Sequence, residues 1–530
     1  MPFYMRPFLF LLLLLIPEWA AARQPDLSFL TTAAERTSFD ETTRYDELMA
    51  FLDVAVSQHP DLRMTTFGYS YEGRALPLVI FGKTASSDPA AIISDSRIRI
   101  FVQANIHAGE VCGKEALLML IRELAEGKHA AWADSAIILL APIYNADGNE
   151  RVNLFNRPRQ NGPHAGMGQR PNAQGLDLNR DHMKVKSPEA RSLIRLMNEY
   201  DPHVLVDLHT TNGTRHGYHI TYSPPLNPNT DPAIDSLLRD SLLPEIGNAF
   251  HAQTGRGVYY YGNLPFRRGE AGWYTFDHRP RFNNNYIGLR NRVAILSEAY
   301  AYATFEERVR ATLAFTVASI EASIARAADI RSAISEAEAR TAPGLVQGVR
   351  FEPSMNAESV DIVMGTTVTR TNPYSGAPYF DRTDSTYIET MPEYGTFAAT
   401  ESLSLPRAYW VDASAADAIA AQLDIHDIRY ERMAETSMGA YQAFRVDSLQ
   451  VAGEPFQMIK EETLSGSWIP QDGVAAEGSL WIPMNQPSAR LAFYLLEPRS
   501  DDGLANWGFF AGRLQAGSLY PVMRIDHDRP

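Results

Sequence analysis

The chain has 530 residues, more than one ordinary hydrophobic core can serve, so we expect two domains. Hydrophobic residues make up 45% and charged residues 21%, a composition that is normal for soluble globular proteins and excludes wholesale disorder. The 63 acidic residues outnumber the 48 basic ones and give a net charge of −15, and no basic run reverses it locally, so we expect no nucleic-acid partner.

The first 22 residues have the pattern of a signal peptide. Arg6 supplies the positive charge, residues 7–16 form an apolar run, and Ala20 to Ala22 offer a small-residue cleavage site. The apolar run is short for a permanent membrane-spanning helix, and no other segment is apolar enough to span. We therefore expect an exported protein, periplasmic or secreted, whose mature form has no permanent membrane span. An uncleaved anchor is the alternative.

Residues 40–340 alternate short apolar runs with stretches of helical periodicity, which is typical of an α/β domain. The predicted strands cover residues 98–106, 136–141, 203–208 and 293–297. The predicted helices cover residues 45–56 and 114–124, with a long one that opens at the capping box Thr304-Phe305-Glu306-Glu307 and runs towards Arg340.

The sequence Ala342-Pro343-Gly344 breaks this last helix and marks a domain boundary. Beyond it the pattern changes to short strand-like pieces and short helices. The strand-like pieces include residues 359–364 and 429–433, and the helices cover residues 413–423 and 488–496. We therefore predict a larger α/β domain over residues 23–340, which would carry the active site, and a smaller α+β accessory domain over residues 341–530.

The strongest local motif is His107-Ala108-Gly109-Glu110, directly after a predicted strand. A histidine and a carboxylate three residues apart can turn onto one cation, and zinc favours this pair together with a third protein ligand and an open position for water. The motif is weak by itself. Its position at the carboxyl end of a strand strengthens it, because open α/β sheets place their sites there.

The third ligand should come from another strand end. Of the 13 histidines, His209 directly follows a strand of buried type and occupies the equivalent position. His203, at the other end of that strand, is better explained as structural, and His216 and His219 are candidates for shaping the pocket. Asp207 is a candidate partner for a ligand, although strand alternation could point it to the other face.

The chain has a single cysteine, Cys112, so no intramolecular disulfide can form. Its position two residues after Glu110 invites interpretation as a metal ligand. A small buried residue at the start of a helix is the simpler interpretation.

Between the candidate ligands, Asn179 and Arg180 stand next to each other in a loop. An arginine can grip a carboxylate through paired charged hydrogen bonds, and an asparagine can orient it. Standing alone, the segment would be better explained as a solvated turn. Upstream, Arg157 and Arg159 offer further guanidinium groups for a polarised carbonyl.

Together these motifs resemble the zinc carboxypeptidase family, the carboxypeptidase A-like metallopeptidases, over about residues 40–330. Four motifs in the family's order are far more specific than any one of them. They are the ligand pair His107-x-x-Glu110, the carboxylate-binding pair Asn179-Arg180, the final ligand His209, and residues 293–298, which look like the strand that carries the catalytic glutamate. Residues 68–74 also look like the family's early strand-turn segment.

The resemblance implies a mixed central sheet flanked by helices and one zinc ion per chain, held by His107, Glu110 and His209. It also implies hydrolysis of C-terminal peptide bonds by a zinc-activated water. The substrate would be a peptide whose free C-terminal carboxylate is anchored by the Asn-Arg pair. Residues 481–507 look like the tails of bacterial members, so we expect packing, not chemistry, from the accessory domain.

The resemblance also implies three further roles. Glu298 would be the catalytic proton shuttle. The arginine that polarises the substrate carbonyl would be Arg157, with Arg159 as the alternative. A mobile tyrosine that closes over the bound end would be Tyr286, with Tyr274 as the alternative.

Three other functions are compatible with the same residues. A zinc-dependent N-acyl amino acid deacylase would use these ligands and a pocket for a small substrate. A cell-wall stem-peptide amidase would share the exopeptidase chemistry. A catalytically inactive peptide-binding module is the third, but it would have no reason to keep the ligands together with Glu298.

Overall fold

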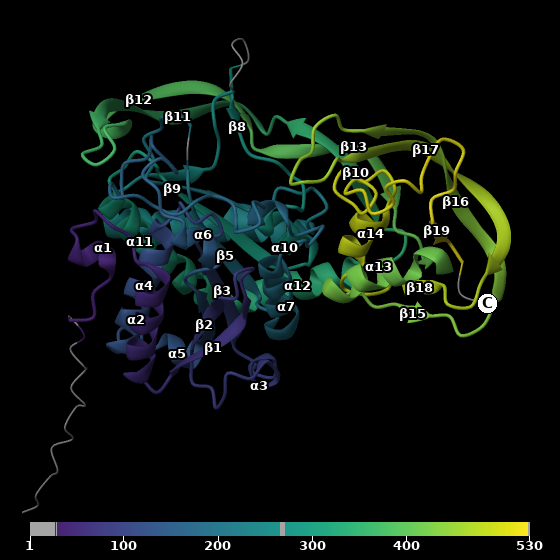
Figure 1. The fold of residues 1–530 in the computed structure, drawn as a ribbon, viewed down its shortest axis with the longest axis horizontal. Helices are drawn as coiled ribbons and strands as arrows, with labels where there is room; N and C mark the ends of the chain where they lie inside the picture. The colour runs from purple at the N-terminus through teal and green to yellow at the C-terminus, as the bar shows by residue number, and fades with distance from the viewer. Residues whose placement is uncertain (1–26, 28, 212, 266–270, 528–530) are drawn as a thin grey trace, which may run out of the picture.

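The structure is a computed structural model, and it describes residues 27, 29–211, 213–265 and 271–527. The predicted signal peptide lies outside the described residues. Figure 1 shows an α/β unit on one side, a second β-rich part beside it, and a long hairpin that runs across the top of the α/β unit. Among the described helices, none combines the length and the apolar character needed to cross a membrane.

The α/β unit is built on one eight-stranded mixed sheet in the order β1-β2-β4-β3-β5-β9-β6-β7. Its strands are β1 (Leu62–Tyr69), β2 (Ala75–Phe81), β3 (Ile98–Ala104), β4 (Ala136–Ala141), β5 (Val204–Thr210), β6 (Ile220–Ser223), β7 (Val258–Tyr260) and β9 (Val293–Ala299). The four central strands β4, β3, β5 and β9 run parallel. The pairs β1–β2, β2–β4 and β6–β9 are antiparallel. The predicted strands and the mixed sheet are confirmed.

Helices cover both faces of this sheet, which explains why every residue of β3, β4 and β5 is buried. On one face, α4 (Cys112–Ala125) comes so close that a Cβ at Gly113 would lie 2.8 Å from the Cβ of Leu208. On the other face, Asp207 accepts a hydrogen bond from Asn283 of α10 (Asn283–Leu289). Consecutive strand residues point to opposite faces, so the two helices lie on opposite sides.

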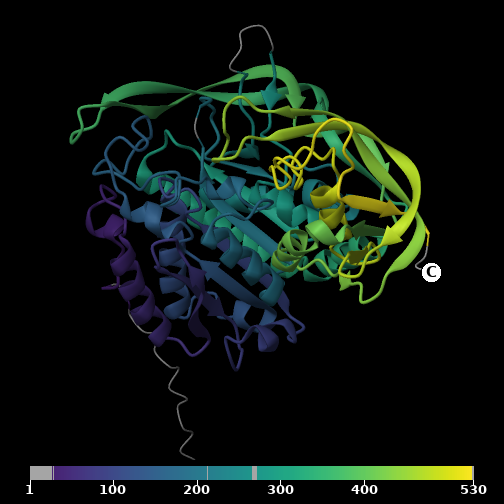
Figure 2. The ribbon, with the colours of Figure 1, turned by 45° about the vertical axis from the view of Figure 1, so that its right-hand side comes forward.

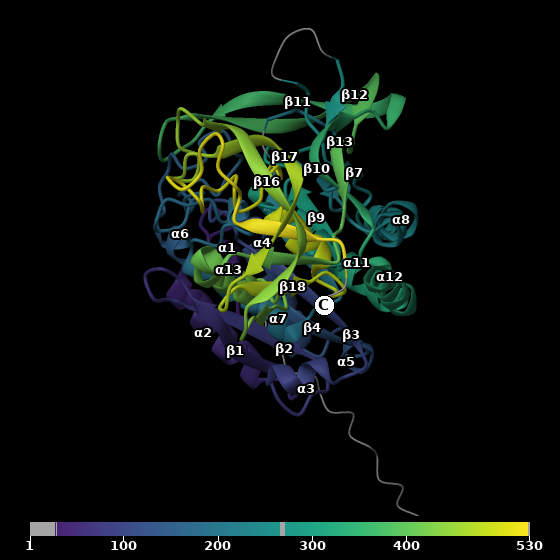
Figure 3. The same cartoon turned by 90° about the vertical axis from the view of Figure 1, so that its right-hand side faces the viewer.

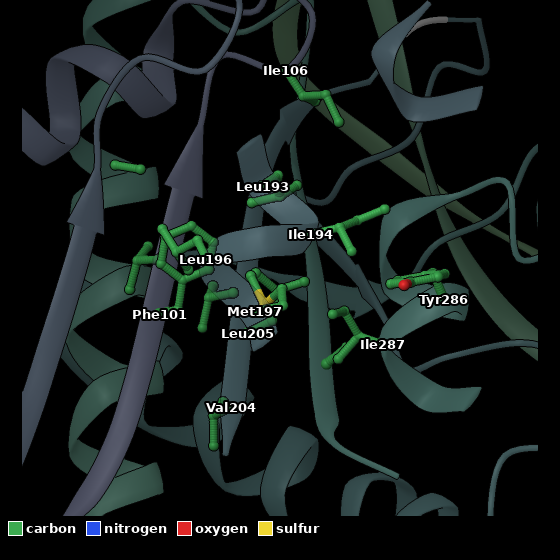
Figure 4. Close-up of a cluster of buried hydrophobic side chains, with 14 of the residues drawn as sticks. Phe101, Ile106, Leu193, Ile194, Leu196, Met197, Val204, Leu205, Tyr286 and Ile287 are labelled. Carbon is green, nitrogen blue, oxygen red and sulfur yellow. The ribbon is translucent and has the colours of Figure 1, made fainter. Parts of the chain in front are cut away.

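Apolar side chains of α7 (Pro188–Tyr200) and α10 pack beside β5 in the core (Figure 4). The remaining helices of the unit are α1 (Ala33–Arg36), α2 (Tyr45–Ser57), α3 (Pro89–Ile93), α5 (Trp132–Ser135), α6 (Ala146–Glu150), α8 (Pro232–Ser236), α9 (Leu243–Thr254), α11 (Phe305–Ala325) and α12 (Ala327–Arg340). The capping box at Thr304 is confirmed, but the long helix that it opens is interrupted at Arg326.

The second part contains longer strands than predicted. A hairpin pairs β11 (Ala357–Thr371) with β12 (Pro378–Tyr394), and another pairs β16 (Ser437–Val451) with β17 (Glu462–Ala475). Most of their side chains are at least partly exposed. Backbone pairing therefore sets the length of these strands, and the sequence shows no alternation of apolar residues from which that length could be predicted.

A six-stranded sheet forms the body of this part, in the order β15-β18-β14-β19-β16-β17. Its short strands are β14 (Ala408–Val411), β15 (Glu431–Arg432), β18 (Leu480–Pro483) and β19 (Val522–Ile525). Two predicted helices appear as α13 (Ala413–Ile425) and α14 (Ala489–Leu496), and β10 (Val346–Ser354) pairs with β13 (Thr396–Ser404).

The β11–β12 hairpin is fastened to the α/β unit rather than to the six-stranded sheet. Its strand β12 pairs in parallel with β8 (Trp273–Tyr274) of that unit. The backbone N–H of Val363 donates to the hydroxyl of Tyr218 over 3.0 Å. A small apolar core joins the two, made of Tyr218, Trp273, Ile362, Met364 and Met391. Figure 3 shows the hairpin above the sheet from the side.

Buried ion pairs also join the two parts, which lie packed side by side in Figure 2. Arg490 of α14 donates to Asp231 over 2.6 Å and to the carbonyl of Asn229 over 3.0 Å. Arg281 donates to Asp502 over 2.8 Å and to Glu461 over 2.7 Å. A buried charged group is stable only when it is paired with an opposite charge. Both ion pairs therefore determine the relative position of the two parts of the chain.

We expect Arg490→Ala to lower the free energy of unfolding by about 3–5 kcal/mol, because it leaves the buried Asp231 carboxylate with one guanidinium partner fewer. Denaturant titration measures the change. The matched control is Glu306→Gln, which breaks an exposed pair with Arg310 and should cost about 1 kcal/mol or less. Equal small losses in both variants would show that the interface pair does not contribute to stability.

Candidate metal centre and active site

His107, Glu110 and His209 converge at the carboxyl ends of β3 and β5, and one ligand atom from each lies within 4.8 Å of the others. Nδ1 of His107 lies 2.9 Å from Oε1 of Glu110, and Nδ1 of His209 lies 2.9 Å from Oε2 of the same carboxylate. All three side chains are buried. The predicted ligand set is therefore brought together as one cluster.

Two further carboxylates orient the ligand histidines. Oδ1 of Asp177 lies 3.0 Å from Nε2 of His107, and Oδ2 of Asp207 lies 3.1 Å from Nε2 of His209. Carboxylates in this position fix the tautomer and leave the opposite ring nitrogen to bind a metal. Asp207 and His209 are two residues apart on one strand and share a face, so alternation does not separate them.

The electrostatics of the cluster favour bound positive charge. Burial alone would raise the pKa of Glu110, but His107 and Arg157 hold it well below its usual value. Burial alone would lower the pKa of His209, but Asp207 and Glu110 hold it well above its usual value. The cluster thus keeps an ionised carboxylate beside a histidine that is flanked by two carboxylates, a donor set that suits a divalent cation.

The donor set fits zinc in particular. Two imidazole nitrogens and one carboxylate are a common protein ligand set for catalytic zinc, with a fourth position left for water or substrate. All three ligands line one cavity of about 190 Å³, hereafter the metal cavity.

Glu298 lies in register beside His209, because β9 pairs in parallel with β5. Its side chain lines the metal cavity, and its Oε2 atom is buried without a hydrogen-bond partner among the described residues. Burial, and to a lesser extent the charge of Glu110, raises the pKa of Glu298 to about 8. An unpartnered carboxylate beside the ligands has the position of a proton acceptor.

Asn179 and Arg180 reach the same cavity from a 3-10 turn, Leu178–Arg180. Oδ1 of Asn179 accepts a hydrogen bond from the backbone N–H of Asn283 over 2.8 Å, so its amide N–H groups are the ones free to donate. The guanidinium of Arg180 lies 3.8 Å from the ring centre of Phe282. Burial lowers the pKa of Arg180 to about 10, which still leaves it charged at neutral pH.

The second part of the chain supports the segments that hold Asn179 and Arg180. Arg281, whose backbone N–H also donates to Asp502 over 2.6 Å, directly precedes Phe282 and Asn283. From a neighbouring turn, the side-chain oxygen of Gln457 accepts from the backbone N–H of Asp177 over 2.7 Å. Residues beyond 340 therefore help to position both the Asn179-Arg180 pair and the Asp177 carboxylate that faces His107.

Two arginines pair with carboxylates of the metal centre, and a third lies farther away. Arg157 donates to Oε1 of Glu110 over 2.5 Å, and this approach requires Gly109, where a Cβ would lie 2.8 Å from Nε of Arg157. Arg170 lines the metal cavity and pairs with Asp177 over 2.8 Å. Arg159 lies in the wall of an adjoining cavity, not in the metal cavity.

The two candidate tyrosines do not line the metal cavity. Tyr286 is fully buried in the core beside α7 (Figure 4), and its hydroxyl lies 2.8 Å from Nδ1 of His426. Tyr274 stacks on Tyr394 of β12, with ring centres 4.3 Å apart. The phenol that does line the cavity is Tyr261, whose pKa is raised by burial and by the charge of Glu298.

Arg170 and Tyr261 are not among the residues predicted from the sequence, and Asp177 had no predicted role. Asp177 lies two residues before Asn179, so an acidic side chain next to the Asn-Arg pair was a usable signal. Arg170 and Tyr261 are brought to the site by loop folding, and nothing in their local sequence marks them.

Comparison with known proteins bears directly on this arrangement. Residues 48–241 match the family described as zinc carboxypeptidase. The chain carries a zinc carboxypeptidase domain. The matched segment of this chain contains the three ligands and the Asn179-Arg180 pair, whereas Glu298 lies beyond it.

Curated relatives match this chain over most of its length. Carboxypeptidase 2 of Trichophyton tonsurans is 24% identical over 487 residues, which cover 86% of this chain and 81% of that protein. Carboxypeptidase 2 of Trichophyton rubrum is 24% identical over 486 residues, with the same coverage.

Solved structures show a more limited similarity. A metallo-carboxypeptidase from Burkholderia cenocepacia is 17% identical, with a TM-score of 0.40 over 53% of this chain and 69% of that one. Carboxypeptidase A from Helicoverpa armigera is 17% identical, with a TM-score of 0.41 over 55% and 75%.

We expect His209→Ala to lower zinc content sharply, because two remaining ligands bind weakly. Asp177→Asn should keep the ligands but weaken zinc affinity by about 10- to 100-fold. Metal analysis after dialysis against a graded chelator measures both. Glu298→Gln is the matched control on the neighbouring strand and should retain wild-type zinc. Full zinc in His209→Ala would contradict the ligand assignment.

Proposed function

We propose that this zinc metallopeptidase hydrolyses the C-terminal peptide bond of peptides that carry a free carboxylate, with Glu298 as the proton shuttle and Asn179 and Arg180 as the carboxylate clamp. The observation that carries the proposal is the metal cavity, which is lined at once by the ligands, Glu298 and the clamp. A base and a carboxylate clamp within one small cavity favour cleavage at a chain end.

The chain's own residues supply the proton transfers and the positioning. Zinc, when bound by the three ligands, lowers the pKa of a bound water and polarises the substrate carbonyl. Glu298 accepts a proton from the attacking water and passes it to the leaving amine. Asn179 and Arg180 hold the terminal carboxylate, and this fixes the scissile bond next to Glu298. Phe282 supports the Arg180 guanidinium from one face.

Two guanidinium groups are candidates for stabilising charge on the carbonyl oxygen. Arg157, the residue expected from the resemblance, already donates to Glu110. Arg170 lines the metal cavity itself and is the better placed of the two. We propose Arg170 for this role, so that Arg170→Ala lowers kcat more than Arg157→Ala does in steady-state assays at full zinc occupancy. The reverse order would return the role to Arg157.

We expect Glu298→Gln to keep its zinc and to lose about 100-fold or more in kcat, because the amide cannot accept the water proton. Peptide hydrolysis followed by mass, with zinc content measured on the same sample, checks both. Activity within a few-fold of the wild type would remove Glu298 from the proton transfer. The same loss with wild-type zinc also excludes an inactive binding module for the native chain.

The clamp predicts a strong preference for free C-termini. Peptides with an amidated C-terminus lack the charged contacts and should be poorer substrates of the wild type by about 10- to 100-fold in kcat/KM. Arg180→Ala should discriminate far less between the two ends. Equal wild-type activity on both would show that no carboxylate clamp operates. Hydrolysis of long peptides separates this function from that of a small-substrate deacylase.

We further propose that the protein is exported, on the strength of the charged, apolar and small-residue segments at its N-terminus. Cleavage after Ala22 should give a mature chain that begins at Arg23. N-terminal sequencing of the protein recovered outside the cytoplasm tests this, and an intact Met1 in washed membranes would favour an anchor instead.

A further inference from the structure

A second, larger cavity adjoins the metal cavity. Its volume is about 1060 Å³, which suits a ligand as large as a short peptide. Arg170 and Thr211 line both cavities, so the two lie next to each other. With the peptide's carboxylate held by Arg180 in the metal cavity, the residues before the scissile bond have this larger cavity to enter. We call it the upstream cavity.

The β11–β12 hairpin forms one wall of the upstream cavity, through Met364 to Thr367, Phe380 and Tyr387. Figure 1 shows the hairpin passing over the α/β unit, and its residues lie beyond the family match, which ends at 241. Further lining comes from the loop that carries Arg159 and from the segment that carries Arg215. The hairpin therefore gives the site a wall that belongs to the second part of the chain.

The charge of the upstream cavity is opposite to that of the protein. Among the described residues, its lining includes Arg157, Arg159, Arg170 and Arg215 and no aspartate or glutamate, although the whole chain has a net charge of −15. Arg157 and Arg170 are already paired with carboxylates of the metal centre. Within the described ranges, Arg159 and Arg215 form no ion pair with a carboxylate. Both residues are exposed to solvent, and both line the upstream cavity.

The hairpin holds both of these arginines in place. The backbone N–H of Phe380 donates to the carbonyl of Arg159 over 3.1 Å, and that of Gly365 donates to the carbonyl of Arg215 over 3.1 Å. The guanidinium of Arg215 also lies 4.7 Å from the ring centre of Phe380. A planar guanidinium fixed by an aromatic ring keeps its edge N–H groups free for a carboxylate.

We infer that the upstream cavity selects peptides with acidic side chains before the scissile bond, at the third and fourth residues from the C-terminus, through Arg159 and Arg215. The inference rests on the proposed carboxypeptidase function and deepens it by naming the substrate class. Positive charge in a walled cavity attracts carboxylates and repels lysine and arginine side chains, and low-dielectric walls strengthen both effects.

The test uses blocked peptides that share their last two residues and differ only at the third and fourth from the end, which are Glu-Glu, Gln-Gln or Lys-Lys. We expect kcat/KM to fall in that order, with the Glu-Glu peptide ahead of the Lys-Lys peptide by about tenfold or more at low salt and by less at 1 M salt. The double variant Arg159→Gln with Arg215→Gln should bring the Glu-Glu to Gln-Gln ratio close to one.

Two control variants separate charge from folding. The double variant Arg159→Lys with Arg215→Lys keeps both charges and should retain most of the acidic preference. Arg310→Gln removes an exposed arginine of α11 that lies outside the cavity lining and should leave the ratio at the wild-type value. A ratio that falls equally in Arg310→Gln would assign the preference to net charge and overturn the cavity assignment.

Binding to Glu298→Gln, measured with the same peptides, gives a second result that does not depend on turnover. Tighter binding of the Glu-Glu peptide without any wild-type hydrolysis would support the cavity and overturn the proposed function. Hydrolysis of all three peptides at equal rates, with equal affinities, would overturn the acidic selection and leave the carboxypeptidase function standing.

Discussion

The parallel register between β5 and β9 is the constraint on which the site depends. It pairs His209 with Glu298 directly across neighbouring strands, a spacing that backbone hydrogen bonds fix at about 5 Å. On the other side, β3 pairs with β5 and ends just before His107. A metal ligand and the candidate base therefore share one rigid sheet, and a slip of one residue would turn one of them to the other face.

The ligands are held by charge as well as by the sheet. Asp177 and Asp207 each face the outer nitrogen of a ligand histidine, and Arg157 faces the ligand carboxylate. Burial makes each of these charges costly unless it is paired, so removing any one leaves another unbalanced. The same low-dielectric surroundings that make the pairs costly strengthen their effect on groups inside the cavity.

Much of the α/β unit could be predicted from the sequence, because its strands are continuous apolar runs and its ligands follow those runs directly. This regularity is the reason why the ligand cluster could be predicted from the sequence, together with the positions of Glu298 and of the Asn179-Arg180 pair beside it. Tyr286 illustrates the limit: an aromatic residue near the catalytic strand looks the same in sequence whether it faces the cavity or the core. Arg170 and Tyr261 reach the site through loops whose course no periodicity records.

The second part of the chain was the least predictable region, for a physical reason. Its long hairpins are exposed on much of their surface and are held by backbone pairing, which leaves little trace in the apolar pattern. Its contacts with the site join residues far apart in the chain, such as Gln457 with Asp177. We expected only packing from this part of the chain, but its residues also line the cavity next to the metal centre.

The Arg281–Asp502 contact has a consequence for the order of events during synthesis. A ribosome makes the ligands, the clamp and Glu298 within the first 300 residues, but Asp502 emerges about 200 residues later. Until then the corner at Phe282 and Asn283, which holds Asn179 in place, lacks this partner. The corner beside the metal cavity therefore gains its full set of supporting contacts only when nearly the whole polypeptide has been made.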